Sequence, residues 1–356
     1  MDISSTRLLD QHLIGKKFNN PEEGVVYFGG VQSQDFSGAK WSLGLRIKNS
    51  TNSDVMRAYN EGSILRTHIM RPTWHFIAPS DIRWMQKLTS PRVKALMGHY
   101  NRKLELTDQV FAKSNTLITK ALQNHNFLTR QELKKVLQDE KISTDTQRLA
   151  HILMWAELES IITSGPMRGK QSTYALLDER VAKTKELSRE ESLAKLVLKY
   201  FQGHGPAQVK DFAWWSGLPI KEANEGMSMI HSKLANETVN GKTYWFLKDM
   251  SIIQEIQTVF LLSVYDEYFI GYTDRSDILE ETHKKTLPVG NALLTSLLII
   301  EGKVAGTWKR SIRKSNVEFK VTSFKKINVK IKESVEEEAK KYATFFGYES
   351  TSITFE

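Results

Sequence analysis

A pattern of helical segments followed by a short hairpin occurs three times before about residue 250, and it restricts the fold more than any other feature. In the first copy, a helix expected to begin near Thr51 and to stop at Gly62 precedes residues 64–77, which are rich in strand-forming side chains. The later copies end in residues 161–177 and 238–247. Helices closed by a hairpin are the winged-helix form of the helix-turn-helix. The pattern therefore predicts three tandem winged-helix domains.

Local signals place several helix starts and one turn in the second and third copies. Thr129 with Glu132, and Ser188 with Glu191, have the spacing of capping boxes, in which side chains satisfy free N–H groups at a helix start. Asn240-Gly241 predicts a two-residue hairpin turn, because both residue types tolerate positive φ.

The pattern changes after about residue 250, where short apolar segments alternate with Gly, Pro and Lys before a last amphipathic helix, SVEEEAKKYATFFG. A chain of 356 residues is too long for one ordinary core, so several domains are expected. We predict an α+β fold. Its domains are expected to be three winged helices and a small barrel-like β-rich domain, in residues 1–105, 106–186, 187–250 and 251–356.

Charge and cysteine content limit the partners and the surroundings of the protein. Fifty Lys and Arg against 41 Asp and Glu give a net charge of +9, which favours an anionic partner such as nucleic acid. The absence of cysteine excludes disulfides, thiolate zinc sites and a cysteine nucleophile, and it fits a reducing cytoplasm. The longest apolar run, Ala292 to Ile300, is too short to span a bilayer and is interpreted as one or two buried strands. We expect no membrane anchor and a cytoplasmic location, with the protein at the nucleoid when bound to DNA.

Two basic segments are candidate DNA contacts. Residues 303–332 contain ten Lys or Arg and one acid, Glu318, which suits a phosphate backbone; a solvated sheet edge protected by lysines is the alternative. In the hairpin over 64–77, basic residues alternate with Thr, Ile and Trp and would share one side of a strand, although such a hairpin is as often structural. The residues expected to contact DNA are Arg66, Arg71, His75, Lys309, Arg310 and Arg313.

Acidic side chains gather around Arg275 in the segment LLSVYDEYFIGYTDRS. Paired carboxylates hold metals or share acid and base roles, but acids beside an arginine at a strand turn more often form ion pairs, and we favour ion pairs. The histidines show no HExxH spacing, and the sequence has no Gly-rich phosphate loop. We therefore expect no metal and no cofactor. The acids concerned are Asp266, Glu267, Asp274 and Asp277.

Polar residues interrupt an otherwise apolar stretch at GGVQSQDFSG. On a helix, Gln32 and Gln34 would point about 200° apart. In a loop that enters the helix, both amides and Asp35 would face one cleft. An amide neither donates nor takes a proton at neutral pH, so such a pair orients water or a sugar and does not act as a general acid.

Five segments in this order, GVQSQD, ILRTHIMRPTWHFIAPSDIRWM, HGPAQVKDFAWWSGL, DEYFIGYTDRS and GTWKR, resemble the bacterial winged-helix DNA-binding proteins whose characterised members are AlkZ-like DNA glycosylases. The resemblance runs from about residue 5 to the C-terminus. It implies three tandem winged helices, a C-terminal barrel-like domain, excision of alkylated purines and unhooking of interstrand crosslinks. It also implies that the catalytic Gln-X-Gln motif of the family falls on Gln32 and Gln34, with Ser33 between them.

The chemistry of base release makes such a motif intelligible. A purine alkylated at N7 or N3 is already cationic, so it departs without the acid that an O-glycoside requires. Two amides, with Asp35, would position water and stabilise positive charge at C1′. We therefore expect a monofunctional DNA glycosylase that acts as a monomer on damaged double-stranded DNA. The alternatives are a winged-helix regulator without catalysis, which needs no amides in a cleft, and a hydrolase of another nucleoside-like substrate.

Overall fold

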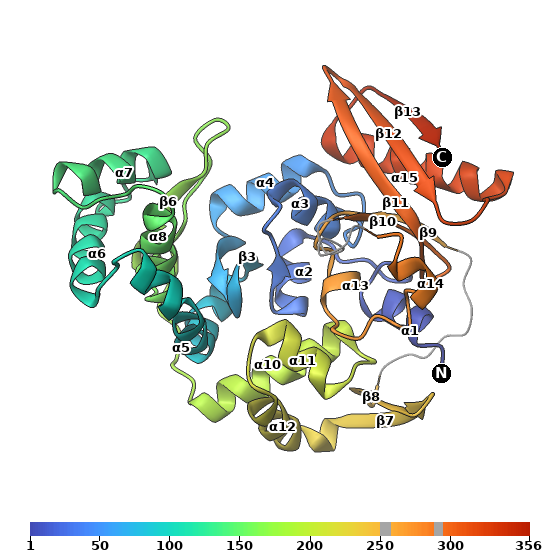
Figure 1. Cartoon of the computed structure of the whole chain (residues 1–356), viewed down its shortest axis with the longest axis horizontal. Helices are drawn as coiled ribbons and strands as arrows, with labels where there is room; N and C mark the ends of the chain where they lie inside the picture. The colour runs from blue at the N-terminus through green and yellow to red at the C-terminus, as the bar shows by residue number, and fades with distance from the viewer. Residues whose placement is uncertain (250–257, 288–294) are drawn as a thin grey trace.

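Helices and small sheets alternate along the chain in a mixed α+β fold, as predicted (Figure 1). The structure is a computed structural model that describes residues 1–249, 258–287 and 295–356. Three sets of helices each carry a small antiparallel sheet, and a larger sheet lies near the C-terminus. Within these described ranges, no helix is both long and apolar enough to cross a bilayer.

The first set contains the polar motif and the first hairpin. Thr51 caps α4 in a capping box with Asp54, and Gly62 ends the helix at φ 88°, as expected for a left-handed C-cap. The sheet has the order β1-β3-β2. The elements are α1 (Ile3–Asp10), α2 (Pro21–Phe28), β1 (Val31–Gln32), α3 (Phe36–Gly44), α4 (Asn52–Glu61), β2 (Leu65–Ile69), β3 (Arg71–Ile77) and α5 (Pro79–Lys103).

The second and third sets confirm the predicted caps and turn. The capping boxes at Thr129 and Ser188 are both formed, and Asn240 and Gly241 have the positive φ angles of a tight hairpin turn. The second set comprises α6 (Asp108–Leu122), β4 (Leu128–Thr129), α7 (Arg130–Asp139), α8 (Arg148–Leu158), β5 (Ile162–Ser164), β6 (Thr173–Leu176) and α9 (Leu177–Arg180). The third comprises α10 (Arg189–His204), α11 (Val209–Ser216), α12 (Ile220–Met229), a 3-10 turn (His231–Lys233), β7 (Leu234–Val239) and β8 (Lys242–Leu247).

Among the described residues the C-terminal sheet is open, so the expected barrel-like arrangement was wrong. Its strand order is β13-β12-β11-β10-β9, which leaves β13 and β9 as edges, and β13 pairs with β12 in parallel. Of the run from Ala292 to Ile300, residues 292–294 lie outside the described chain and the end forms β10. The elements are β9 (Val259–Leu262), α13 (Glu267–Ile270), α14 (Glu281–Lys284), β10 (Ser296–Ile300), β11 (Lys303–Arg313), β12 (Asn316–Ser323), α15 (Val329–Phe346) and β13 (Ser350–Phe355).

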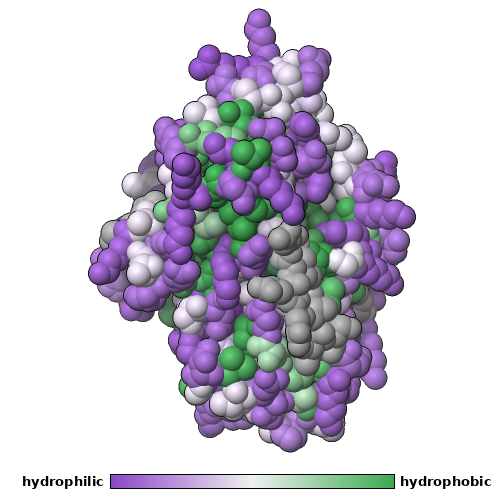
Figure 2. Space-filling view, turned by 90° about the vertical axis from the view of Figure 1, so that its right-hand side faces the viewer, coloured by the Kyte–Doolittle hydropathy of each residue, from purple (hydrophilic) through white to green (hydrophobic). Residues whose placement is uncertain are grey.

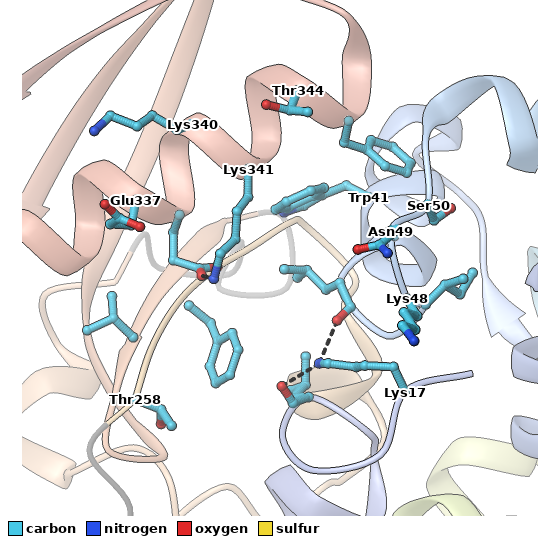
Figure 3. A pocket seen from close by; sticks show the side chains of 18 of the residues that line it. Lys17, Trp41, Lys48, Asn49, Ser50, Thr258, Glu337, Lys340, Lys341 and Thr344 are labelled. Carbon is cyan, nitrogen blue, oxygen red and sulfur yellow. Dashed lines mark hydrogen bonds and ion pairs between the residues drawn. The ribbon is translucent and has the colours of Figure 1, made fainter. Parts of the chain in front are cut away.

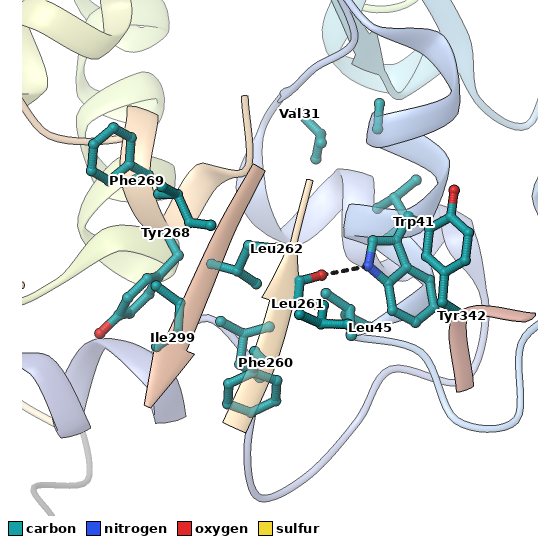
Figure 4. Packing of buried hydrophobic residues seen from close by; sticks show 14 of the residues in the cluster. Val31, Trp41, Leu45, Phe260, Leu261, Leu262, Tyr268, Phe269, Ile299 and Tyr342 are labelled. Atoms are coloured by element: carbon teal, nitrogen blue, oxygen red, sulfur yellow. Dashed lines mark hydrogen bonds between the residues drawn. The ribbon is translucent and has the colours of Figure 1, made fainter. Parts of the chain in front are cut away.

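The largest core joins the first set of helices to the C-terminal sheet. Trp41 of α3 packs against β9, and its indole N–H donates to the carbonyl oxygen of Leu261 at 2.8 Å (Figure 4). A second core joins the hairpin β2–β3 to α10, α11 and α12 of the third set. The polar motif, which begins at Gln32, therefore lies where the first set of helices, the third set and the C-terminal region meet.

Candidate active site

The Gln-X-Gln motif lies in an extended segment that leads into α3, which corresponds to the loop rather than the helix alternative. β1 pairs with β3 so that Gln32 lies opposite His75, and the Ser33 N–H donates to the Trp74 carbonyl at 2.7 Å. Asp35 is the N-cap of α3 and accepts a hydrogen bond from the Gly38 N–H. The motif is thus held along the edge of the first hairpin.

The Gln32 side chain is buried and its orientation is fixed by Arg71. Arg71 Nη2 donates to Gln32 Oε1 at 2.6 Å. A guanidinium has donors and no acceptor, so the amide oxygen must face Arg71. The amide nitrogen of Gln32 makes no hydrogen bond within the described chain, which leaves an N–H donor pair for a ligand.

Gln34 and Asp35 are exposed, in contrast to Gln32. The main-chain N–H of Trp74 donates to Gln34 Oε1 at 3.3 Å, so the oxygen of this amide also faces the hairpin. Its amide nitrogen likewise has no partner in the described residues. Asp35 uses Oδ1 for its cap, and Oδ2 is left as an acceptor.

Glu267 of α13 was not predicted to belong to this site, yet its buried carboxylate accepts a hydrogen bond from the main chain of the motif. Its Oε1 accepts the main-chain N–H of Gln32 at 2.8 Å, across 235 residues of sequence. Its Oε2 accepts from His204 Nε2 and Trp215 Nε1, both at 3.0 Å. Burial would raise the pKa of Glu267, but the hydrogen bond and charge of His204 and the Gln32 N–H hold it below its ordinary value. A buried carboxylate thus joins the third set of helices to the motif.

The basic residues of the first hairpin do not form an exposed row. His75 is completely buried and donates through Nδ1 to the Thr73 carbonyl, while Arg71 holds Gln32. Arg66 is half-buried and donates to the Ser33 carbonyl, with its guanidinium 4.4 Å from the centre of the Trp74 ring. In this structure these side chains shape the motif, and His75 does not reach the surface.

The basic residues of the β11–β12 hairpin are more accessible. Lys309 is exposed, and Arg313 is 77% exposed beside Glu318. Arg310 is half-buried, since its guanidinium lies over the Tyr342 ring and donates to Ser37 Oγ. Figure 2 shows hydrophilic side chains at the top of the molecule, the end at which this hairpin projects in Figure 1.

The acidic residues around Arg275 diverge to separate partners, as the ion-pair interpretation requires. Asp266 makes a bidentate buried pair with Arg46, at 2.8 and 2.9 Å. Asp274 pairs with Lys210 and Lys242. Asp277 accepts from the Tyr244 hydroxyl and lies 3.5 Å from Arg7. Among the described residues, no group of three or more His, Cys, Asp or Glu is placed to hold a metal ion.

A large cavity lies away from the motif. It has a volume of about 890 Å³ and separates the C-terminal end of α3 from α15, whereas Asp35 caps the opposite end of α3 (Figure 3). Lys17 points into it, donates to three main-chain carbonyls, and has a pKa lowered to about 8 by burial. This cavity does not contain the predicted catalytic residues.

A chain whose helical sets carry small hairpin sheets, and from which a cationic hairpin projects, is typical of proteins that bind nucleic acid. The family model described as DNA glycosylase AlkZ-like matches residues 26–345, and the chain belongs to this family of DNA glycosylases, as the motifs predicted. A curated relative, the interstrand DNA cross-link repair glycosylase of Streptomyces sahachiroi, is 22% identical over 295 residues and covers 79% of each chain. The solved structure of the Streptomyces sahachiroi DNA glycosylase AlkZ matches with a TM-score of 0.83 at 21% identity. That match covers 100% of this chain and 98% of the other, and it shows that the two share a fold.

The buried, neutral His75 predicts a specific pH dependence of stability. Burial, reinforced by the charge of Arg71, lowers its pKa from 6.5 to about 3, so between these values the unfolded chain binds a proton that the folded chain does not. Stability should therefore decrease as the pH is lowered across this window, by up to about 1.4 kcal/mol per pH unit from this group. His75→Asn keeps a donor for the Thr73 carbonyl and does not titrate, so its urea midpoint should vary less between pH 6.5 and 4. Equal pH slopes for the variant and the wild type would contradict the burial of His75.

Proposed function

We propose that the protein is a monofunctional glycosylase that hydrolyses the N-glycosidic bond of cationic alkylated purines in double-stranded DNA. Membership of the glycosylase family supports the reaction type. The observation that carries the proposal is the orientation of Gln32 and Gln34, whose amide oxygens both face N–H donors of the hairpin. Both amides therefore offer N–H groups, and Asp35 offers a carboxylate oxygen, to a ligand at the motif.

These groups suit the placement of a water molecule. One amide N–H donates to one lone pair of the water oxygen and Asp35 accepts a water hydrogen, so the second lone pair remains to attack C1′, while the other amide is left to orient the sugar. As the C–N bond breaks, the cationic base leaves as a neutral purine, and the proton of the water passes to Asp35 and then to solvent. No acid is needed at the leaving nitrogen. Release of N7-methylguanine from duplex DNA, detected as abasic sites, tests this proposal.

Crosslinked purines are a second proposed substrate. The relative from Streptomyces sahachiroi is named for interstrand cross-link repair, and a purine joined to another base through N7 is cationic in the same way. The chemistry at Gln32 and Gln34 would be unchanged, since hydrolysis at C1′ depends on the positive charge of the purine and not on which group at N7 produces it.

We propose winged-helix domains in residues 1–105, 106–186 and 187–250, followed by a β-rich region in residues 251–356. Support comes from the small sheet that accompanies each set of helices and from the fold shared with AlkZ. We also propose that the protein acts as a monomer. A cytoplasmic location is proposed because the absence of cysteine fits a reducing compartment, where disulfides do not form.

The β11–β12 hairpin is proposed to bind DNA through its phosphates, without sequence preference. Replacing Lys309 and Arg313 by glutamate should weaken binding and reduce the slope of log K against log salt by about 2, because two phosphate contacts are lost. The melting temperature should hardly change, since exposed charges add little stability. Arg310 is left in place because it contacts Tyr342.

The control for this pair is Lys170→Glu with Lys185→Glu, which reverses the same charge at exposed positions outside the hairpin. Both double variants should be titrated with one labelled duplex at several salt concentrations. Equal losses of DNA affinity in the two double variants would mean that net charge alone, rather than the hairpin, determines binding.

A further inference from the structure

Trp214 of α11 is a large aromatic ring left partly exposed beside the Gln32 site. Its side chain is 38% exposed, and its indole N–H donates to the Ile270 carbonyl at 3.1 Å, which fixes the ring. The guanidinium carbons of Arg71 and Arg275 lie 5.7 and 5.8 Å from the ring centre. A fixed, partly exposed ring with two cations beside it is typical of a surface that receives part of a nucleotide.

Both guanidinium groups have unused donors. Arg71 spends Nη2 on Gln32, and Arg275 spends Nε on the Phe269 carbonyl at 2.7 Å. Nη1 of each makes no hydrogen bond in the described chain and is not fully buried. Neither arginine forms an ion pair with a described carboxylate, because those nearby, Glu267 among them, are committed to other donors.

The proximity of the two cations is unfavourable in the free protein. Burial lowers the pKa of Arg275 to about 10, and the charge of Arg71 adds to this effect against the opposing charge of Asp211. Burial also lowers the pKa of Arg71. An anion that accepts from both guanidinium groups would offset their repulsion and satisfy the free donors.

We propose that Arg71 and Arg275 together bind one DNA phosphate next to the nucleotide that is processed, with the Trp214 ring packed on the adjoining deoxyribose. This inference rests on the proposed action on DNA and names the phosphate site that belongs to it. Since Arg71 also holds Gln32 Oε1, the same phosphate contact fixes the catalytic amide. Phosphate binding and amide orientation are thereby coupled through one side chain.

Single methylphosphonate substitutions test this site, because they remove the charge of one phosphate without changing the protein. Duplexes carrying a stable tetrahydrofuran abasic analogue would each have one neutral linkage, placed in turn at the phosphates that flank the analogue. Binding is measured by fluorescence anisotropy at fixed salt. One placement should weaken wild-type binding about ten- to hundredfold, as expected for charge-assisted hydrogen bonds.

Arg275→Met should bind the unmodified duplex more weakly by a similar factor and should lose its sensitivity to that one methylphosphonate. Lys185→Met removes the same charge from an exposed linker and should keep the sensitivity. Equal sensitivity of Arg275→Met and the wild type at every placement would overturn the proposal. So would a wild type that is insensitive at all flanking phosphates, a result that does not depend on how any variant folds.

The binding experiment requires no base release, so its outcome is separate from that of the proposed function. A protein that shows the methylphosphonate coupling but releases no alkylated base has the phosphate site without the glycosylase activity. A protein that releases base without the coupling has the activity and lacks this site.

Discussion

Gln34→Ala should lower the single-turnover rate of base release by about 10²–10³-fold, while affinity for damaged DNA and the melting temperature stay close to wild type. The amide of Gln34 is exposed and acts on the water mainly in the transition state, where the loss of one preorganised hydrogen-bonding group has an effect of this size. Affinity should survive because phosphate contacts elsewhere supply most of it. The measurement is single-turnover excision of N7-methylguanine from duplex DNA with enzyme in excess.

Three comparisons make this result specific to the motif. Gln138→Ala removes another exposed amide, on α7, and should leave the rate unchanged. Gln32→Ala should also lower the rate by well over tenfold, although it leaves Arg71 without its acceptor. Asp35→Asn should match or exceed the loss of Gln34→Ala, because we assign Asp35 as the acceptor of the water proton. Wild-type rates of base release in both glutamine variants would show that Gln32 and Gln34 do not take part in the mechanism.

Glu267→Ala should lower the free energy of unfolding by about 3–5 kcal/mol, the effect expected when one partner of a buried charged network is removed. The substitution leaves three buried donors, on Gln32, His204 and Trp215, without their acceptor. Base release should fall as well, since the main chain of Gln32 loses its anchor. Urea unfolding at pH 7 measures the first effect.

Glu336→Ala is the matched control, because Glu336 is exposed on α15 and its removal should change stability by less than about 0.5 kcal/mol. Glu267→Gln retains one acceptor and should fall between the wild type and the alanine variant. An unfolding curve for Glu267→Ala that matches the wild type would contradict the buried network.

Features set by neighbouring residues could be predicted from the sequence. The caps at Thr129 and Ser188 and the turn at Asn240-Gly241 depend on a few consecutive side chains, and all three are confirmed. The barrel-like sheet was wrong because closure depends on pairing between distant strands. The C-terminal strand β13 adds in parallel to β12 at one edge, and nothing in its local sequence specifies that partner.

In the candidate site, too, the features that depend on neighbouring residues could be predicted, whereas the contacts between residues far apart in the sequence could not. The motif at Gln32 could be located, and its extended backbone follows from the cap at Asp35. Glu267 could not be assigned, since only the folded chain brings its carboxylate to the Gln32 N–H. The alternation of basic residues around Arg66 predicted that they share one side of a strand, with DNA contact or a structural role left open. In the structure Arg66 donates to the Ser33 carbonyl and Arg71 to Gln32, so both side chains hold the motif.

The most direct test of the account compares duplexes that carry a single N7-methylguanine, uracil or hypoxanthine, each incubated with excess wild-type protein and then cleaved at abasic sites with mild alkali. We predict loss of the cationic base and retention of the two neutral ones, because the segment from Gln32 to Asp35 provides no strong general acid for a neutral leaving base. Intact N7-methylguanine in a duplex that the protein demonstrably binds would contradict the account and favour a DNA-binding role without catalysis.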